Sequence, residues 1–395
     1  MAIIQANQMK RILPAIVLSQ FFCTSVWFAG SAVIGDIAKQ LNLGVVYLGY
    51  LASAVQFGFI AGTLLFAMLS IADRFRPTVV FCACGILAST VNLPLVFDGI
   101  QTYQVIVFRF LTGFFLAGIY PVGMKIASDH YQHGLGRSLG YLVGALVLGT
   151  AFPHLLKSLP GNIPWKFVII CTSVLSAIGG LTMYFLVPDG EHRQSGQKIN
   201  FLGFLTSFKD RRFRSFTFGY FGHMWELYAF WLFVPLMIKT FATHNPSAHL
   251  NITLLSFFVI AAGSISCILS GLLSQSFGSK KIASIALIVS LACCILSPLL
   301  LLTSSAAAFI TFLLIWSMAV IADSPLFSTL IAQYAKPQFK GASLTIVNCI
   351  GYCITILSIQ LINSLYTIGN AQYIYLLLGI GPLLGLVALF AEKVG

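Results

Sequence analysis

Two ionisable side chains interrupt an apolar and aromatic run near the middle of the chain. The stretch from 221 to 230 reads FGHMWELYAF, so that His223 and Glu226 lie three residues apart. A carboxyl group that leaves water favours its neutral form and can exchange a proton near neutral pH. We therefore predict that Glu226 carries a coupling proton, with His223 as its partner or as a substrate ligand. In the structural alternative, a protonated Glu226 bonds to His223 or to a backbone carbonyl and fixes helix packing.

A second buried acid is predicted in the sequence ADSPLF, where Asp323 precedes Pro325 by two residues. Proline lacks an N–H group and bends a helix, and bent helices often flank ligand sites inside membranes. Asp323 is therefore predicted to carry a proton, to bind a cation or to pair with Arg109. The alternative is local bonding of Asp323 or Ser324 to the backbone at the bend.

Basic candidates lie on one earlier segment. Arg109 and Tyr120 are eleven residues apart, which places them on one helix face, and a guanidinium can grip a carboxylate or phosphate in bidentate fashion. We predict that both contact the substrate, unless Arg109 forms a structural pair with Asp36. Lys125 lies four residues before Asp129, and a structural pair of these two is favoured.

Neutral polar and aromatic residues extend the candidate binding site. Each forms a helix–helix hydrogen bond more often than a ligand contact, but together they would line a mixed pocket. Lys125 is a reserve candidate for the same site, because a kink at Pro121 would change the helix face on which it lies. The neutral candidates are Gln20, Trp27, Gln56, Asn348 and Tyr352.

The elements that position these residues follow from composition. Of the 395 residues, 58% are hydrophobic and only 8% are charged, with a mean hydropathy of +0.94. Soluble domains carry about 25% charged residues, so this is a membrane protein. No segment alternates with the period of a barrel strand, and an all-α polytopic protein is predicted. The twelve expected spans are 11–36, 45–72, 78–97, 103–129, 138–158, 165–187, 214–239, 251–274, 282–303, 306–334, 341–363 and 371–391.

The net charge of +12 is unevenly distributed along these spans. With the N-terminus inside, sixteen of the 22 Lys and Arg residues fall on the cytoplasmic side. This is the positive-inside bias, which predicts cytoplasmic termini in a multi-pass inner-membrane protein and argues against nucleic-acid binding. The outer side has only Lys39, Lys157, Lys166 and Lys239.

One long connection divides the spans six and six. We predict an N-terminal bundle at 1–190, a cytoplasmic linker at 191–213 and a C-terminal bundle at 214–395. Within the linker, the helical spacing of Phe201, Phe204, Leu205 and Phe208 beside basic residues indicates an amphipathic helix on the inner leaflet. A solvated linker is the alternative.

The two halves share short basic turns at equivalent places. LSIADRFRP contains Asp73 and Arg74 between spans two and three, and GLLSQSFGSKK contains Gly271, Gly278 and Lys280 between spans eight and nine. With RFLTG in span four, these turns resemble elements of the major facilitator superfamily over the whole chain. The first turn lacks the usual glycines and the second lacks the acid.

The resemblance implies two pseudo-symmetric six-helix bundles of twelve transmembrane helices. Spans one, four, seven and ten would surround a cavity, spans two, five, eight and eleven would flank it, and the others would face lipid. Five charged residues are predicted inside the membrane, and all belong to the central spans: Arg109, Lys125, Asp129, Glu226 and Asp323. The resemblance also implies a cytoplasmic gate formed by Asp73, Arg74, Asp129, Gly271, Gly278 and Lys280.

These observations together predict a secondary active transporter that moves a small organic anion or zwitterion by proton-coupled alternating access. One alternative is proton-driven export of an amphipathic or cationic compound or a siderophore-like metabolite. Another is a substrate-sensing or lipid-handling protein that does not transport. The chain has no phosphate-loop, zinc-protease or nucleophile-elbow motif. We therefore expect no enzyme activity, cofactor or metal, and a monomer whose partners are the substrate, protons and lipids.

Overall fold

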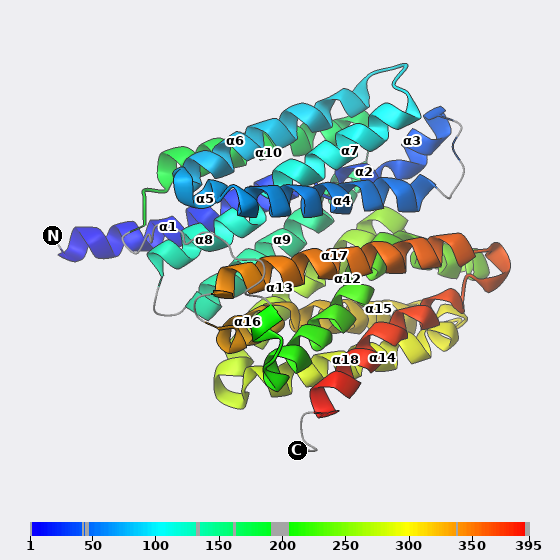
Figure 1. Ribbon diagram of the computed structural model, residues 1–395. Coiled ribbons are helices and arrows are strands. Elements are labelled where there is room, and N and C mark those ends of the chain that lie inside the picture. Colours follow the sequence, from blue (N-terminus) through cyan, green and yellow to red (C-terminus); the bar gives the residue numbers. More distant parts are fainter. Residues whose placement is uncertain are drawn as a thin grey trace. The chain divides into compact units, whose positions relative to one another are not determined.

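The fold is entirely helical in the part of the chain that the structure describes, and Figure 1 shows its arrangement. The computed structural model describes residues 2–41, 43, 47–131, 135–160, 163–190, 205–336 and 339–391. No strand occurs in these ranges. The all-α prediction is confirmed. Most of the predicted linker helix, including Phe201 and Phe204, lies outside the described residues.

The chain divides into two compact units. Unit 1 comprises Met1–Tyr47 and Ala54–Lys198, and unit 2 comprises Leu48–Ser53 and Ile199–Gly395. Unit 1 contains α1 (Ala2–Thr24), α2 (Ala29–Ala32), α3 (Ile34–Leu41), most of α4 (Tyr47–Met68), α5 (Ile71–Arg74), α6 (Pro77–Asn92), η1 (Leu93–Val96), α7 (Thr102–Leu116), α8 (Tyr120–His130), α9 (Leu135–Ser158) and α10 (Lys166–Leu186). Unit 2 contains α12 (Arg211–His244), η2 (Pro246–Ala248), α13 (Ile252–Phe277), α14 (Ser279–Leu301), α15 (Ala306–Ala322), α16 (Ser324–Tyr334), α17 (Lys340–Leu365), η4 (Ile368–Asn370), η5 (Ile374–Gly379) and α18 (Ile380–Phe390).

The apolar helices correspond to the twelve predicted spans. Ten helical segments of the described chain are long and apolar enough to cross a membrane. Two shorter apolar segments, Arg11–Thr24 and Ile374–Phe390, occupy the places of spans one and twelve. A bilayer core of about 30 Å needs roughly 20 helical residues, so the 34 residues of α12 extend beyond it.

Among the described residues, spans one, four and ten are each divided between two α-helices. Span one stops at Thr24 and restarts at Ala29, span four is divided between α7 and α8, and span ten is divided between α15 and α16. Pro121 and Pro325 lie in the first turn of the second halves of spans four and ten, and they explain those two breaks. The break in span one has no proline, and the sequence did not predict it.

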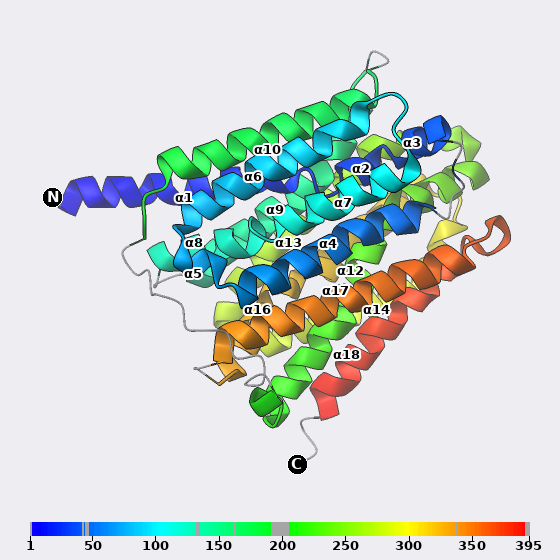
Figure 2. The ribbon, with the colours of Figure 1, turned by 45° about the horizontal axis from the view of Figure 1, so that its top comes forward.

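Close helix contacts in unit 1 depend on glycine. A Cβ atom on Gly113 would lie 1.8 Å from the carbonyl oxygen of Val55, and one on Gly58 would lie 1.9 Å from that of Phe110. The glycine of the RFLTG element therefore permits α7 to pack backbone to backbone on α4. On the other side of this unit, α6 and α10 lie side by side (Figures 1 and 2).

Unit 2 has a similar contact between α12 and α18. A Cβ atom on Gly222 would lie 2.3 Å from the carbonyl oxygen of Gly381, and the reverse distance is also 2.3 Å. This contact holds one face of α12 against span twelve. Another face of α12 contacts α14, α15 and α16. The buried ionisable residues of unit 2 lie on this side of α12.

Candidate functional site

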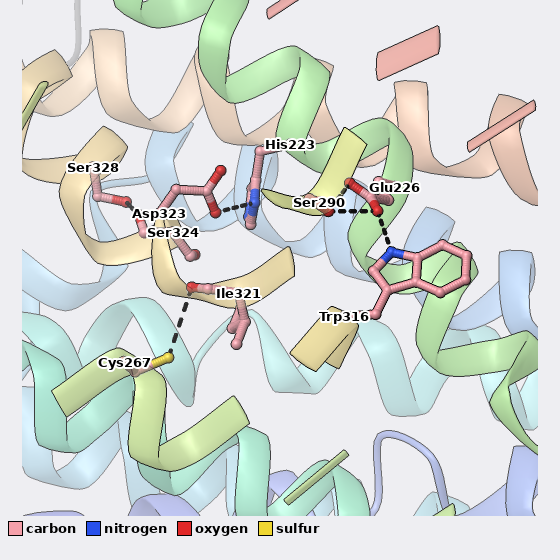
Figure 3. A network of polar contacts seen from close by, with 9 residues as sticks. All are labelled: His223, Glu226, Cys267, Ser290, Trp316, Ile321, Asp323, Ser324 and Ser328. Atoms are coloured by element: carbon pink, nitrogen blue, oxygen red, sulfur yellow. Dashed lines mark hydrogen bonds and ion pairs between the residues drawn. The ribbon is translucent and has the colours of Figure 1, made fainter. Parts of the chain in front are cut away.

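The break in span ten positions Asp323 in unit 2. Helix α15 ends at Ala322, α16 begins at Ser324, and Pro325 has no N–H group to offer the carbonyl of Ile321 four residues earlier. The thiol of Cys267 on α13 lies 3.8 Å from that carbonyl oxygen and acts as a weak donor (Figure 3). Asp323 therefore lies at a bend that a neighbouring helix supports.

Asp323 and His223 face each other across this bend, and both are buried. His223 Nδ1 lies 2.7 Å from Asp323 Oδ1, and the two side chains are 0% and 1% exposed (Figure 3). The contact departs from hydrogen-bond geometry. Asp323 Oδ2 and His223 Nε2 have no hydrogen-bond partner among the described residues. Because buried polar atoms are normally satisfied, these two atoms indicate a place for a proton, a water or a ligand.

Glu226 faces a different set of partners. Ser290 Oγ lies 2.6 Å from both carboxylate oxygens, Trp316 Nε1 donates to Oε1 at 2.6 Å, and Cys294 Sγ lies 3.2 Å from the same atom. The side chain is completely buried between α12, α14 and α15 (Figure 3).

The predicted pairing of His223 with Glu226 is therefore wrong. Three residues along a helix rotate a side chain by about 60° from the first. That rotation turns His223 toward the bend in span ten and turns Glu226 toward α14. The carboxylate that pairs with His223 is instead Asp323.

Polar contacts join α12 to α17 on another face. Tyr220 Oη donates to Asn348 Oδ1 at 2.6 Å, and the hydroxyl groups of Tyr228 and Tyr352 lie 2.7 Å apart. Asn348 and Tyr352 thus make the helix–helix hydrogen bonds that the sequence left open as the alternative to ligand binding.

Arg109 closes the break of span one in unit 1. Its guanidinium donates to the carbonyl oxygens of Val26, at 3.2 Å, and of Trp27, and the side chain is 1% exposed. Both carbonyls lie in the turn between α1 and α2, where they are outside the hydrogen bonding of either helix and can accept from a cation. No carboxylate lies within ion-pair distance of Arg109 in the described ranges. The alternative pair with Asp36 is wrong, because Asp36 pairs with Lys157 at 2.5 Å.

The other substrate candidates of unit 1 lie on α1, α4 and α8 and in the turn after α1. Gln20 is fully buried against Gly123, and neither end of its amide has a hydrogen-bond partner in the described part of the chain. Gln56 is 2% exposed, and its Oε1 likewise has no such partner there. The Trp27 ring lies 5.0 Å from that of Phe59, and Tyr120 is the first residue of α8.

The family model that describes the Major Facilitator Superfamily matches residues 16–360. The chain belongs to this superfamily. It is therefore a multi-pass membrane transporter, and the twelve-helix fold follows. No curated protein sequence matches the chain.

Solved structures show the same superfamily fold at low sequence identity. A bacterial homologue of the human lysosomal transporter Spinster is 14% identical, with a TM-score of 0.68 over 97% of this chain and 95% of that one. The human organic anion transporter MFSD10 is 13% identical, with a TM-score of 0.73 over 96% of this chain and 99% of that one. A mutant of the nucleoside transporter NupG is 13% identical, with a TM-score of 0.70 over 96% of this chain and 98% of that one.

The superfamily turn in unit 1 contains an unexpected ion pair. Lys125 Nζ lies 2.8 Å from Asp73 Oδ1, so the predicted partner Asp129 is wrong for Lys125. The ion pair joins α5 to the middle of α8. Asp129 is buried and lines a small hollow with Thr78 and His130. Arg74 is exposed.

The corresponding turn in unit 2 depends on a glycine. Gly278 has a φ of +84°, a value that other residues rarely adopt, and it joins α13 to α14. Lys280 Nζ lies 5.8 Å from the centre of the Phe216 ring. The carbonyl of Gly271 accepts a hydrogen bond from Ser274 at 2.9 Å. The gating role of both turns stays a prediction.

Several residues at these sites were not found from the sequence. Span nine was expected to face lipid, yet its Ser290 and Cys294 contact Glu226. The spacing of Ser290, Cys294 and Ser297 on one face, all 1% exposed or less, was the available signal. His154 was also missed, and it is 3% exposed with no partner for either ring nitrogen among the described residues.

Proposed function

We propose that this protein is a proton-coupled secondary transporter of a small organic anion or zwitterion that works by alternating access. The proposal rests chiefly on the buried pair of His223 and Asp323 at the break of span ten. Ionisable groups are costly in a membrane interior and usually mark ion or proton pathways. We place the chain as a monomer in the inner membrane, with both termini in the cytoplasm.

The geometry favours Asp323 over Glu226 as the acid that exchanges the coupling proton. Neither oxygen of Asp323 has a hydrogen-bond partner in the described chain, whereas the Glu226 carboxylate is contacted by Ser290, Cys294 and Trp316. A carboxylate that accepts several hydrogen bonds is stabilised where it lies and is slow to change partners. Glu226 then serves mainly to hold α12 against α14 and α15, and it remains the second candidate for the proton.

Protonation of Asp323 would change the contact between α12 and α16. An ionised Asp323 attracts a protonated His223, and this attraction is strong where water is excluded. A neutral Asp323 loses that attraction, which frees α16 to move relative to α12 at a bend that already exists. Discharge of the proton on the other side of the membrane would restore the pair and reset the transporter.

Arg109 supports an anionic group on the substrate. It is a buried cation that donates to two carbonyl groups in the turn between α1 and α2, and these carry only partial negative charge. A carboxylate or phosphate would compensate the guanidinium more completely than the carbonyls do. Gln20 and Gln56 add amide groups that would bind the neutral polar part of such a substrate.

The test uses purified protein in liposomes that contain a pH-sensitive dye, with an inward proton gradient. Monocarboxylates, dicarboxylates, phosphate esters and amino acids are added in turn. We expect at least one class to carry protons inward with the wild type, and Asp323→Asn to abolish the coupled signal. Asp98→Asn is the matched control, because Asp98 is 85% exposed and bonds to Lys166. Unchanged coupling in Asp323→Asn would exclude Asp323 as the coupling acid.

Export by proton exchange is the second candidate. The aromatic surroundings of the unit 2 acids favour it, since Phe230 lies 4.8 Å from the Trp316 ring and Phe327 lies 6.3 Å from His223. Such rings beside an acid suit an amphipathic cation. Inward proton flow driven by a cationic drug on the opposite side, with no response to anions, would identify export. Saturable binding without any flux would instead indicate a sensing protein.

A further inference from the structure

The C-terminal end of α16 is bonded to the chain segment that precedes α12. Lys336, two residues beyond the end of α16, donates its backbone N–H to the Ser207 hydroxyl at 3.2 Å. The same hydroxyl lies 3.4 Å from that of Ser343 on α17. Ser207 is 1% exposed, so water does not compete for these contacts. One serine therefore joins residues 205–210 to two helices of unit 2.

The segment that contains this serine is itself fixed to the first turn of α12. The Asp210 carboxylate caps that helix by accepting from the Phe213 amide at 2.9 Å. The Arg214 guanidinium donates to the carbonyls of Phe208 and Lys209 at 2.9 and 3.1 Å. The serine hydroxyl is therefore held in place by α12, and it can serve as a fixed point for the end of α16.

The N-terminal end of α16 has a contact of a different kind. Asp323 lies there, with its Oδ1 atom 2.7 Å from His223 Nδ1 on α12 (Figure 3). The eleven residues of α16 make a helix about 16 Å long. A hydrogen bond between neutral groups holds one end of it, and a contact between two ionisable groups holds the other. Only the second contact changes when a proton arrives.

Between these ends, α16 rests on a smooth part of α12. A Cβ atom on Gly219 would lie 2.5 Å from Cε1 of Phe327, so the phenyl ring lies against the backbone of α12. No side chain projects from α12 at this position to block the ring. Near the C-terminal end, the Tyr334 ring lies 5.1 Å from that of Phe216 on α12 and supports the fixed point. The half-helix can therefore rock about one end.

We propose that Ser207 is a positioning residue for transport, which holds the C-terminal end of α16 while protonation of Asp323 releases the other end. The half-helix then rocks about Ser207 instead of shifting as a whole. Ser207 acts through Lys336 and α16, and it contacts neither the proton nor the substrate. The role given to Asp323 rests on the proposed function.

The test measures amide hydrogen exchange in the purified full chain by mass spectrometry, so it needs no known substrate. Two amides report the two ends of α16. The Phe327 N–H donates to the Asp323 carbonyl at 2.9 Å, and the Ala335 N–H donates to the Ile331 carbonyl at 2.9 Å. Exchange at each amide follows the local opening of that end of the helix.

Ser207→Ala should loosen both ends. Loss of one hydrogen bond predicts about fivefold faster exchange at Ala335. Because α16 is a single rigid helix, we expect about twofold faster exchange at Phe327 as well. Ser215→Ala is the matched control, since Ser215 is 5% exposed and donates to the Ala388 carbonyl at 2.8 Å. It loses a buried bond between α12 and α18, and it should change neither amide.

Asp323→Asn, which imitates the neutral acid, shows which end is released. In the wild type it should speed exchange at Phe327 about fivefold and leave Ala335 unchanged, because Ser207 still holds the C-terminal end. In the Ser207→Ala background it should speed exchange at Ala335 too, by about threefold beyond the effect of Ser207→Ala alone.

Several results would overturn the proposal. Faster exchange at Ala335 alone in Ser207→Ala would mean that the serine supports only its neighbour. An equal response to Ser215→Ala, or strictly additive effects with Asp323→Asn, would exclude a fixed point at Ser207. If Ser207→Ala does not fold, Lys336→Pro removes the donor of the same bond and is judged by the same amides. Ala335 already has the ψ of 144° that suits a residue before proline.

Failure of the proposed function would be seen in a different assay. It would appear as unchanged proton coupling of Asp323→Asn in liposomes, whereas the exchange measurement involves no transport. Loosening of both ends of α16 by Ser207→Ala, together with retained coupling in Asp323→Asn, would show a fixed point at Ser207 that positions a helix without the coupling acid. That result would overturn the role in transport and keep only the mechanical one.

Discussion

Gly30 is expected to be the residue that lets Arg109 close the break in span one. A Cβ atom at Gly30 would lie 2.8 Å from Arg109 Nε and 3.0 Å from Cζ. The guanidinium is the end of a flexible side chain, so it would move rather than resist. Its hydrogen bonds to the carbonyls of Val26 and Trp27 would then be lost.

The cost of Gly30→Ala follows from those two bonds. A hydrogen bond to a charged group contributes about 1.5 kcal/mol or slightly more to stability, and polar contacts within membranes are often weaker. We expect Gly30→Ala to lower the free energy of unfolding by about 2 kcal/mol. The measurement is reversible unfolding in mixed micelles. Gly35→Ala is the matched control, because no atom lies within 4 Å of a Cβ at that position.

A double-mutant cycle isolates the mechanism. In an Arg109→Met background the carbonyl bonds are already absent, so Gly30→Ala should cost about 1.5 kcal/mol less than in the wild type. If Gly30→Ala costs the same in both backgrounds, the glycine acts through its own backbone or through other neighbours, and it does not make room for Arg109. Equal effects of Gly30→Ala and Gly35→Ala would refute that role as well.

Three other changes test the remaining contacts. Ser290→Ala should lower stability by about 2 kcal/mol in unfolding measurements, because Glu226 loses a buried donor, and an unchanged midpoint would contradict this. Cys267→Ala should reduce coupled transport more than Cys267→Ser, since serine keeps a donor for the carbonyl at the bend; equal rates would show that the thiol does not support it. Lys125→Gln should lower stability by only about 0.5 kcal/mol, because the pair is about one quarter exposed, and exchanging Lys125 and Asp73 should recover the loss in thermal melts. A larger loss that the exchange does not recover would count against the pair.

Much of the fold could be predicted from the sequence because a bilayer imposes strict rules on a chain. Backbone groups in hydrocarbon must bond within helices, so the apolar runs alone predicted the twelve spans and the all-helical class. The proline positions likewise predicted the bends of spans four and ten, since a missing N–H group is a local property. The break in span one had no such local cause and was not predicted.

The sequence by itself also predicted the buried charges Arg109, Glu226 and Asp323, because so few charges interrupt the apolar runs. Their partners were decided only by the tertiary structure. His223 pairs with Asp323 rather than with Glu226, and Lys125 pairs with Asp73 rather than with its neighbour on the same helix. The physical reason is that rotation about a helix axis depends on how neighbouring helices pack. Glycine contacts such as that of Gly222 with Gly381 fix this packing between residues far apart in the chain. The spacing of residues along a single helix gives no information about such contacts.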